Sequence, residues 1–405
     1  MEPQKKKAYQ LIILLGFVSL FGDIIYEGAR GVSGQYLQVL GVNATRVGLI
    51  VGVGEFAGYL FRLISGYFAD KTKSYWFFTI LGYLLLLSIP LISLTDSWQI
   101  VAILTIVERV GKGIRTPARD TIVSHASKQI GSGLTFGISE FIDQIGSIIG
   151  PLIFTYVLYN ITSNNLISSY QKGFSITLLP YLILLIILLI TYKEFKNSEE
   201  LENRLSLQPR KDKLPSIFHI YTIFTFITTS GFISFSIIGF HLKKYNIISD
   251  HYIPLLYALA VGAIDAITGL TIGKYYDILN KKSTNRLSGI NLLLIIPIST
   301  IITSLFVFNF NIYIILIGII FFGITLGLQE VILKAIVSDI IHIDKRSTAY
   351  GILNISTGTA CFFGATLSGY LYDISITFLI VFLIITQLVS ILFFIVMRQK
   401  LNNSY

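Results

Sequence analysis

Charged side chains stand within stretches that are otherwise apolar, and these are the residues whose types could do chemistry. The segment 107–120, "VERVGKGIRTPARD", carries six charged residues directly after an apolar run. Asp23, Glu27 and Arg30 are spaced i, i+4 and i+7, so on a helix they would share one face. Carboxylates held beside cations in an apolar medium can exchange protons as their surroundings change. The pattern indicates either proton-coupled chemistry or a set of structural ion pairs.

The composition places these charges in a membrane protein. Of the 405 residues, 53% are hydrophobic and only 13% are charged, whereas about a quarter of the residues in soluble domains are charged. Apolar runs of about 20 residues recur along the chain, and each can cross a hydrocarbon core of about 30 Å. A β-barrel would show short alternating segments instead. The predicted fold class is therefore an all-α polytopic membrane protein.

The apolar runs predict twelve transmembrane helices, interrupted by one long polar stretch at 192–216. The predicted spans are 8–39, 45–69, 75–95, 98–126, 132–160, 168–192, 216–242, 250–277, 284–307, 311–341, 347–372 and 375–398. The domains follow as an N-terminal six-helix bundle over 1–192, a cytoplasmic linker over 193–215 and a C-terminal six-helix bundle over 216–405.

Lysine and arginine set the predicted orientation, because cytoplasmic loops carry an excess of them. With the N-terminus inside, the outer loops hold only Arg46, Lys172, Lys243 and Lys244. We therefore expect both termini to be cytoplasmic and the protein to lie in the cell membrane. The formal net charge of +9 then reports topology, and we expect no nucleic-acid partner.

The two halves contain matching segments. Gly66 to Asp70 near the end of the second span is repeated by Gly273 to Asp277 near the end of the eighth. A second match, at an offset of 214, places the Ile-Val-Ser of 122–124 on that of 336–338. Two halves of common origin are typical of transporters whose binding site lies at the midplane between the repeats.

Ionisable residues within the spans follow a period of three. Spans 3, 6, 9 and 12 have none away from their ends, so every third helix can face lipid. The others must shelter charge or polar groups in a cavity or against partners. The candidates to line a central cavity are Arg30, Glu55, Arg62, Asp265, Glu330, Lys334 and Asn354.

Depth in the membrane selects the candidates for proton coupling. Asp23 is the first choice, because it lies near mid-bilayer and because Glu27, one turn away, would oppose ionisation of both. Glu140 and Asp143 form a similar pair at i, i+3. Arg109 reaches the same depth and would hold whichever of these acids is ionised.

Other chemistries lack their motifs. The sequence has no Gly-rich Lys-Ser/Thr phosphate loop, and its five histidines have no metal-ligand spacing. The single cysteine, Cys361, cannot form an intramolecular disulfide. We therefore expect no cofactor and no metal. A membrane-bound enzyme would need a nucleophile beside a base, and a sensor would need an effector domain; neither is evident, so both are less favoured than a transporter.

The segment Gly66-Tyr-Phe-Ala-Asp70-Lys71 resembles the loop 2–3 motif of the major facilitator superfamily, and the resemblance covers essentially the whole chain. It implies that Asp70 caps helix 11 in the outward-facing state, and that Gly273 and Asp277 form the second copy of this gating motif. The sequence departs from the motif at Lys73, Ser74 and Tyr75, where a glycine and two basic residues are expected.

The opening segment also resembles the family. Arg109-Val-Gly-Lys-Gly113 is similar to its helix 4 motif Arg-x-x-Gln-Gly, whose arginine is associated with proton transfer, with Lys112 in place of glutamine. "GKGIRTPARD" resembles the signature of a prokaryotic subgroup. For Arg115 and Arg119 we favour an interpretation as interfacial anchors with snorkelling side chains.

Helix 5 carries Gly137, Gly146 and Gly150-Pro151, which resemble a motif of exporters that exchange substrate for protons; Phe154 stands where the motif continues with glycine. The same glycines could serve only close helix packing. The resemblance implies a monomeric secondary transporter whose partners are a small organic solute, protons and membrane lipid, with proton-coupled export favoured. Proton-coupled import of an organic anion or other nutrient is the alternative.

Overall fold

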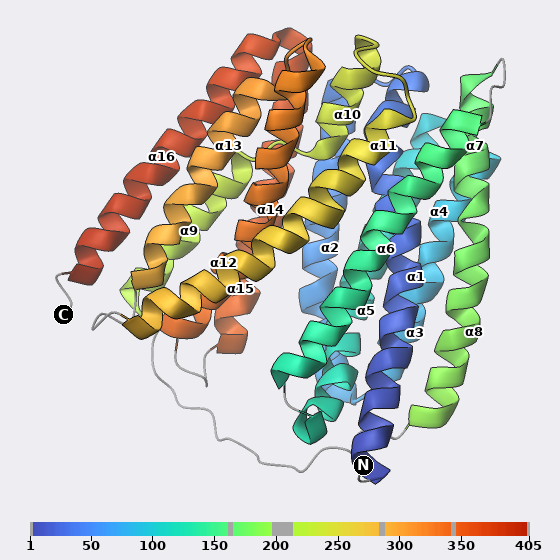
Figure 1. Cartoon of the computed structure of the whole chain (residues 1–405), viewed down its shortest axis with the longest axis vertical. Helices are drawn as coiled ribbons and strands as arrows, with labels where there is room; N and C mark the ends of the chain where they lie inside the picture. Colours follow the sequence, from blue (N-terminus) through green and yellow to red (C-terminus); the bar gives the residue numbers. More distant parts are fainter. Residues whose placement is uncertain are drawn as a thin grey trace. The chain divides into compact units, whose positions relative to one another are not determined.

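The computed structural model describes residues 3–130, 132–160, 165–196, 214–282, 288–341 and 346–402, and every regular element within these ranges is helical (Figure 1). The predicted linker lies mostly outside them, at 197–213. Each predicted span contains one helix or a run of short helices. The all-α fold class is therefore confirmed.

The first six spans are helical as predicted, and the third and sixth are divided into shorter pieces. Their elements are α1 (Pro3–Val39), α2 (Ala44–Thr72), α3 (Tyr75–Leu84), η1 (Leu85–Leu87), α4 (Ser88–Leu91), η2 (Ile92–Leu94), α5 (Trp98–Ile130), α6 (Ser132–Asn160), α7 (Leu166–Ile176) and α8 (Leu178–Phe195).

The last six spans contain a π-helical segment, η4, within the eighth. Their elements are α9 (Ser216–Ser230), α10 (Phe235–Lys244), α11 (Tyr252–Tyr257), η4 (Ala258–Ile264), α12 (Asp265–Lys282), η5 (Ser288–Leu294), α13 (Ile295–Phe306), α14 (Ile312–Ile340), α15 (Arg346–Ile374) and α16 (Ile376–Asn402).

Ten helical segments in the described part of the chain are long and apolar enough to cross a membrane. Of the predicted spans, those formed by α5 and α15 are not among them. The α5 helix carries the charged segment 107–120, and α15 is rich in glycine, serine and threonine.

The helices form two compact units. Unit 1 comprises Met1–Val42, Val53–Ser206 and Ser249–Ala258, and unit 2 comprises Asn43–Gly52, Leu207–Ile248 and Leu259–Tyr405. Each unit therefore includes a short segment from the other half of the sequence. The division into bundles at 193–215 stays a prediction.

In unit 1, glycines bring α6 into backbone contact with α1. A Cβ atom at Gly146 would lie 2.5 Å from the carbonyl oxygen of Leu20, and one at Gly150 would lie 2.3 Å from that of Ile24. No other residue fits at such distances without displacing a helix. Gly146 and Gly150 of the exporter-like motif thus have a packing role, whereas a Cβ atom at Gly137 would meet nothing within 4 Å.

Glycines also seat α5 against α2 and α3 within unit 1. A Cβ atom at Gly113 would lie 2.3 Å from the carbonyl oxygen of Gly58 on α2, and one at Gly82 on α3 would lie 2.6 Å from that of Gly111. The hydroxyl of Ser65 donates a hydrogen bond to the carbonyl of Gly113 at 3.2 Å. This contact holds the charged side chains of α5 beside α2.

Unit 2 packs α14 against α12 and α13, and packs α15 and α16 against α9. Some of its buried polar groups form neutral pairs. Thr228 Oγ1 donates to Gln387 Oε1 at 2.8 Å, and Gln387 Nε2 donates to the Thr228 carbonyl at 2.9 Å. The Ser299 and Thr325 hydroxyls lie 2.8 Å apart.

Apolar side chains are exposed along the sixth and twelfth spans, as expected for helices that face lipid. Those on α8 are Leu179, Leu182, Ile186, Leu189 and Ile190, and those on α16 are Phe378, Val381, Ile385, Leu388, Leu392 and Ile395.

Candidate functional site

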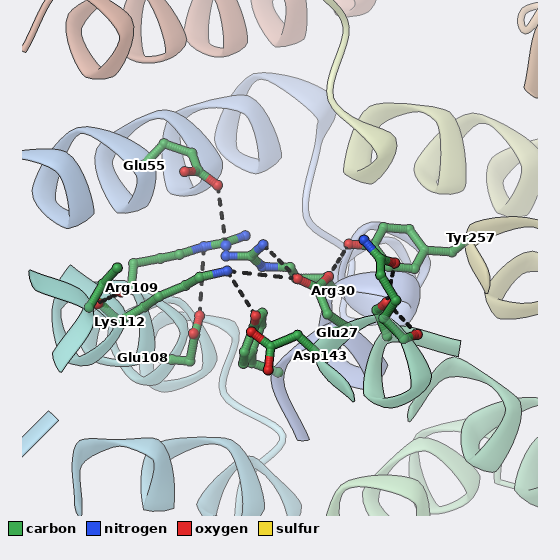
Figure 2. Close-up of polar contacts among 12 residues, drawn as sticks. Glu27, Arg30, Glu55, Glu108, Arg109, Lys112, Asp143 and Tyr257 are labelled. Atoms are coloured by element: carbon green, nitrogen blue, oxygen red, sulfur yellow. Dashed lines mark hydrogen bonds and ion pairs between the residues drawn. The ribbon is translucent and has the colours of Figure 1, made fainter. Parts of the chain in front are cut away.

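Buried ions on α1, α2 and α5 gather in unit 1 (Figure 2). The ion pairs form two groups, Glu27 with Arg30 and Lys112 and Arg109 with Glu55 and Glu108. We call these six residues together the central network, because α5 supplies Glu108 and Arg109 to one group and Lys112, one turn away, to the other. The α1 and α5 helices each supply both acids and bases, whereas α2 supplies one carboxylate.

Glu27 contacts two cations of this network and one tyrosine outside it. Arg30 Nη1 donates to Glu27 Oε1 at 3.0 Å, and Lys112 Nζ lies 3.9 Å from the same oxygen. The hydroxyl of Tyr257 on α11 donates a hydrogen bond to the other oxygen, Oε2. Glu27 is buried, so this carboxylate links α1, α5 and α11 where water does not screen it.

Arg109 pairs with two other carboxylates. Its Nη1 lies 3.2 Å from Glu55 Oε1, and its Nε lies 3.7 Å from Glu108 Oε2. Glu108 is only 1% exposed and Arg109 only 9%. Arg109 therefore connects α5 to α2, and its carboxylate partners are not those of α1 or α6.

The ring of Tyr26 lies among three cations. Lys112 Nζ is 4.1 Å from the ring centroid, Arg30 is 4.9 Å away and Arg115 is 5.5 Å away. Lys112 also donates to the Tyr26 hydroxyl at 2.9 Å. Cations held over a ring face are stabilised by its quadrupole, more strongly where water is absent. The tyrosine thus helps to hold positive charge in the interior.

Arg115 and Arg119 do not fit the interpretation as snorkelling anchors. Arg115 is 4% exposed, with its guanidinium 4.9 Å from the ring centroid of Tyr83. Arg119 donates to the hydroxyl of Ser19 and lies 3.0 Å from Asp120 and 3.4 Å from Asp143. Both side chains turn toward neighbouring helices because acceptors and aromatic rings are present there.

Among the predicted proton-coupling residues, the structure brings some together and separates others. Asp23 is 8% exposed at the contact of α1 with α6, where a Cβ atom at Gly146 would come within 2.7 Å of its own Cβ. Asp143 forms an ion pair with Arg119, not with Arg109. Glu140 is exposed, and the ion pairs of the described residues do not include it. The predicted roles of all three stay predictions.

The first gating motif lies at the end of α2. Asp70 is exposed and accepts a hydrogen bond from the Tyr75 hydroxyl at 3.1 Å, so a tyrosine partly fills the place of the expected basic residue. Lys71 is exposed, with its Nζ 5.9 Å from the Tyr67 ring centroid. A Cβ atom at Gly66 would meet only Pro117, at 3.5 Å. Tight packing is therefore no reason for a glycine at 66.

In the second motif, on α12, a Cβ atom at Gly273 would lie 3.3 Å from Val331. The side chain of Asp277 lies outside the described residues. The proposed gating by both motifs is untested.

The remaining cavity candidates occupy varied positions. Arg62 on α2 lies 5.1 Å from the Tyr59 ring centroid. In unit 2, Asp265 is buried where α12 begins after the π-helical segment, whereas Glu330 and Lys334 are exposed on α14 and Asn354 is half-buried on α15.

Sequence reasoning missed Tyr26 and Tyr257 as members of the site. Tyr26 could have been found, because it lies within one turn of Asp23, Glu27 and Arg30. Tyr257 comes from more than two hundred positions away in the sequence, and only the packing of α11 against α1 brings it to Glu27.

Comparison with known proteins identifies the family. The model of the Major Facilitator Superfamily matches residues 12–303. The chain belongs to this superfamily. The resemblance noted in the sequence is thereby confirmed, and the protein is a multi-pass membrane transporter of this family.

Similar proteins occur in bacteria and archaea. An uncharacterized protein of Mycobacterium tuberculosis H37Rv is 35% identical over 397 residues, covering 96% of this chain and 93% of that protein. An uncharacterized MFS-type transporter of Methanocaldococcus jannaschii is 27% identical over 374 residues, covering 90% and 89%.

Solved transporters share the fold at low identity. The nucleoside transporter NupG matches with a TM-score of 0.67 and 14% identity, covering 96% of this chain and 98% of its own. A POT family transporter in complex with 5-aminolevulinic acid matches with a TM-score of 0.73 and 14% identity, covering 95% and 94%.

Proposed function

We propose that this protein is a secondary transporter that exports a small organic solute in exchange for protons, by alternating access. The observation that carries the proposal is the position of Asp23. It is buried at the contact of α1 and α6, and the ion pairs of the described residues do not include it. An ionised carboxylate is costly in such a place, and uptake of a proton removes that cost.

The neighbours of Asp23 give it a way to respond to conformation. Glu27 lies one turn away and is held by Arg30 and Lys112, and Asp143 on α6 is held by Arg119. Opening a path to water on one side of the membrane would hydrate Asp23 and shift these cations. Both changes alter the relative stability of its two protonation states, so proton binding follows the conformational cycle.

Export is favoured by the resemblance of Gly137, Gly146 and Gly150-Pro151 to the antiporter motif. Import of an organic anion is the second candidate, and a specific observation favours it. The Nε atoms of Arg30 and Arg62 are buried, and neither makes a hydrogen bond within the described part of the chain. An anionic group of a solute could accept from them.

The cellular setting belongs to the same proposal. The lysine and arginine distribution supports cytoplasmic termini and a location in the cell membrane, and the chain would act as a monomer without a cofactor or metal. Its partners would be the solute, protons and lipid, not nucleic acid. Proton movement needs no covalent catalysis, so we propose no enzymatic activity.

Proton movement in proteoliposomes tests the proposal. Purified protein is reconstituted with a pH-sensitive dye inside, and solutes are screened for proton flux that depends on both solute and protein. Asp23→Asn should abolish solute uptake or release driven by a pH gradient, while solute exchange at equal pH continues. Asp96→Asn, at an exposed position before α5, is the matched control and should behave as wild type.

Unchanged gradient-driven flux in Asp23→Asn would show that Asp23 is not the carrier. The same measurement on Glu140→Gln and Asp143→Asn then decides between the remaining acids of this group, followed by Glu27, Glu55 and Asp265.

A further inference from the structure

The central network contains equal numbers of acidic and basic groups. Its three carboxylates belong to Glu27, Glu55 and Glu108, and its three cations belong to Arg30, Arg109 and Lys112. Each cation lies within 4 Å of at least one of the carboxylates (Figure 2). The network therefore carries no net charge when all six groups are ionised.

Both signs of charge also retain unused hydrogen-bonding capacity. Glu108 Oε1 is buried and has no hydrogen-bond partner among the residues that the structure describes, and the same holds for Arg30 Nε. Arg109 Nη1 lies 3.2 Å from Glu55 but is not aligned for a hydrogen bond. A buried acceptor on a carboxylate and buried donors on two guanidinium groups thus occur among the residues of the central network.

This combination restricts the charge of a solute that can bind. A solute with a single charge would add an uncompensated ion to a balanced, poorly hydrated site, which is costly. A fully uncharged solute would leave the charged hydrogen-bonding groups only weakly satisfied. A solute with one positive and one negative group adds no net charge and can pair with both kinds of group.

We propose that the central network binds zwitterionic solutes, with the anionic group on Arg30 and Arg109 and the ammonium group on Glu108. This inference rests on the proposed transport function and specifies its substrate class. Guanidinium groups match the planar geometry of a carboxylate, and a buried carboxylate is a strong acceptor for an ammonium group. The chemical class is that of amino acids, short peptides and related amino-carboxylates.

Matched probes test the charge requirement at equilibrium. The full-length protein in detergent is heated with amino acids and dipeptides in four forms: both ends free, amino end acetylated, carboxyl end amidated, or both ends capped. A ligand that binds only the folded protein raises its unfolding temperature. We expect stabilisation by one or more uncapped probes and its loss when either end is capped.

Three results would overturn the inference. The first is a lack of stabilisation by every uncapped probe, the second is stabilisation that survives the capping of one end, and the third is binding confined to singly charged or uncharged forms. None of these depends on a variant protein, so a misfolded mutant cannot obscure the answer.

Two substitutions then assign the groups. Glu108→Gln should weaken binding of the uncapped probe by at least about tenfold and reduce the penalty for acetylating the amino end. Arg109→Gln should do the same for amidation of the carboxyl end. Asp96→Asn should change neither. If the two capping penalties do not respond separately, the assignment of the groups is wrong.

The outcomes separate this inference from the transport proposal. Binding is measured without a gradient, whereas proton coupling is measured as dye-reported flux. If uncapped probes bind but Asp23→Asn retains proton-driven flux, the proposed coupling fails and the substrate class stands. If Asp23→Asn loses coupling for a solute that is not zwitterionic, the substrate class fails alone.

Discussion

The two units use the same packing device but different polar groups. The repeat offset of 214 places Gly150 on Gly364. A Cβ atom would lie 2.3 Å from the Ile24 carbonyl oxygen at Gly150 and 2.4 Å from the Ser230 carbonyl oxygen at Gly364. Unit 1 thus needs a glycine where α6 packs against α1, and unit 2 needs one where α15 packs against α9. The same close contact occurs in both halves of the chain.

The charged residues, in contrast, differ between the two halves of the chain. The same offset aligns Glu140 with Asn354 and Asp143 with Thr357. Two acids of unit 1 therefore correspond to neutral polar residues in unit 2. Unit 1 pairs its buried ions, whereas unit 2 satisfies hydroxyls with amides and with other hydroxyls. The close packing thus occurs in both units, whereas the ion pairs of the described residues lie in unit 1, which is why we place proton coupling there.

The largest expected effect on stability is in the charged interior of unit 1. Glu27→Gln leaves Arg30 and Lys112 without their shared carboxylate, and removal of one member of a buried ion pair costs about 3–5 kcal/mol. Breaking the neutral pair of unit 2 by Gln387→Leu should cost less, about 1–3 kcal/mol for unsatisfied Thr228 groups. Denaturant titration of both variants in detergent measures the difference. Equal costs would mean that the ions of unit 1 are already well hydrated.

The packing glycines should be equivalent in the two units. Gly150→Ala and Gly364→Ala each force a methyl group against a carbonyl oxygen, and overpacking of this kind costs about 1–3 kcal/mol. The two losses of unfolding free energy should agree within about 1 kcal/mol, because the distances are nearly the same. Gly137→Ala is the matched control, since a Cβ atom there meets nothing within 4 Å. If only Gly150→Ala lowered the free energy of unfolding, the two glycine contacts would not be equivalent in energy.

Spans were predictable from the sequence because membrane thickness sets the length of each apolar run. The α5 span was predicted over 98–126 although it contains most of the charged segment 107–120. The pairing of side chains was not predictable. Arg109 and Arg119 lie ten residues apart on one helix, about 15 Å along its axis, and the register of α5 against α6 decides that Arg119, not Arg109, reaches Asp143.

The fold also moves individual residues into sites that sequence order does not suggest. From the sequence, Arg115 is interpreted as an interfacial cation, because it lies toward the end of its span that is predicted to be cytoplasmic. The structure buries it against the rings of Tyr26 and Tyr83, because Gly82 and Gly111 let α3 and α5 approach closely. Such contacts depend on tertiary packing that apolar periodicity does not encode.

The smallest expected effect concerns the first turn of α2, which two side chains cap within unit 2. Asn43 Oδ1 accepts from the Arg46 amide at 3.1 Å, while Asp373 accepts from the Ala44 amide at 3.1 Å and the Thr45 amide at 2.7 Å. Asp373 also accepts from the Thr45 hydroxyl at 2.6 Å. The first amides of a helix have no acceptor within it. Asp373 on α15 supplies the acceptors for the Ala44 and Thr45 amides of α2.

Asp373→Ala should cost about 0.5–2 kcal/mol, as for other helix caps, because the site is exposed and water can replace the lost acceptor. Hydrogen exchange gives a sharper measurement than global unfolding. The Ala44 and Thr45 amides should exchange faster in Asp373→Ala, whereas Asn43→Ala should act mainly on Arg46. If Asp373→Ala lowered the free energy of unfolding as much as Glu27→Gln, the comparison would be contradicted. An exposed helix cap would then contribute as much stability as a buried ion pair. Unchanged exchange at Ala44 and Thr45 would show that Asp373 does not hold α2 in solution.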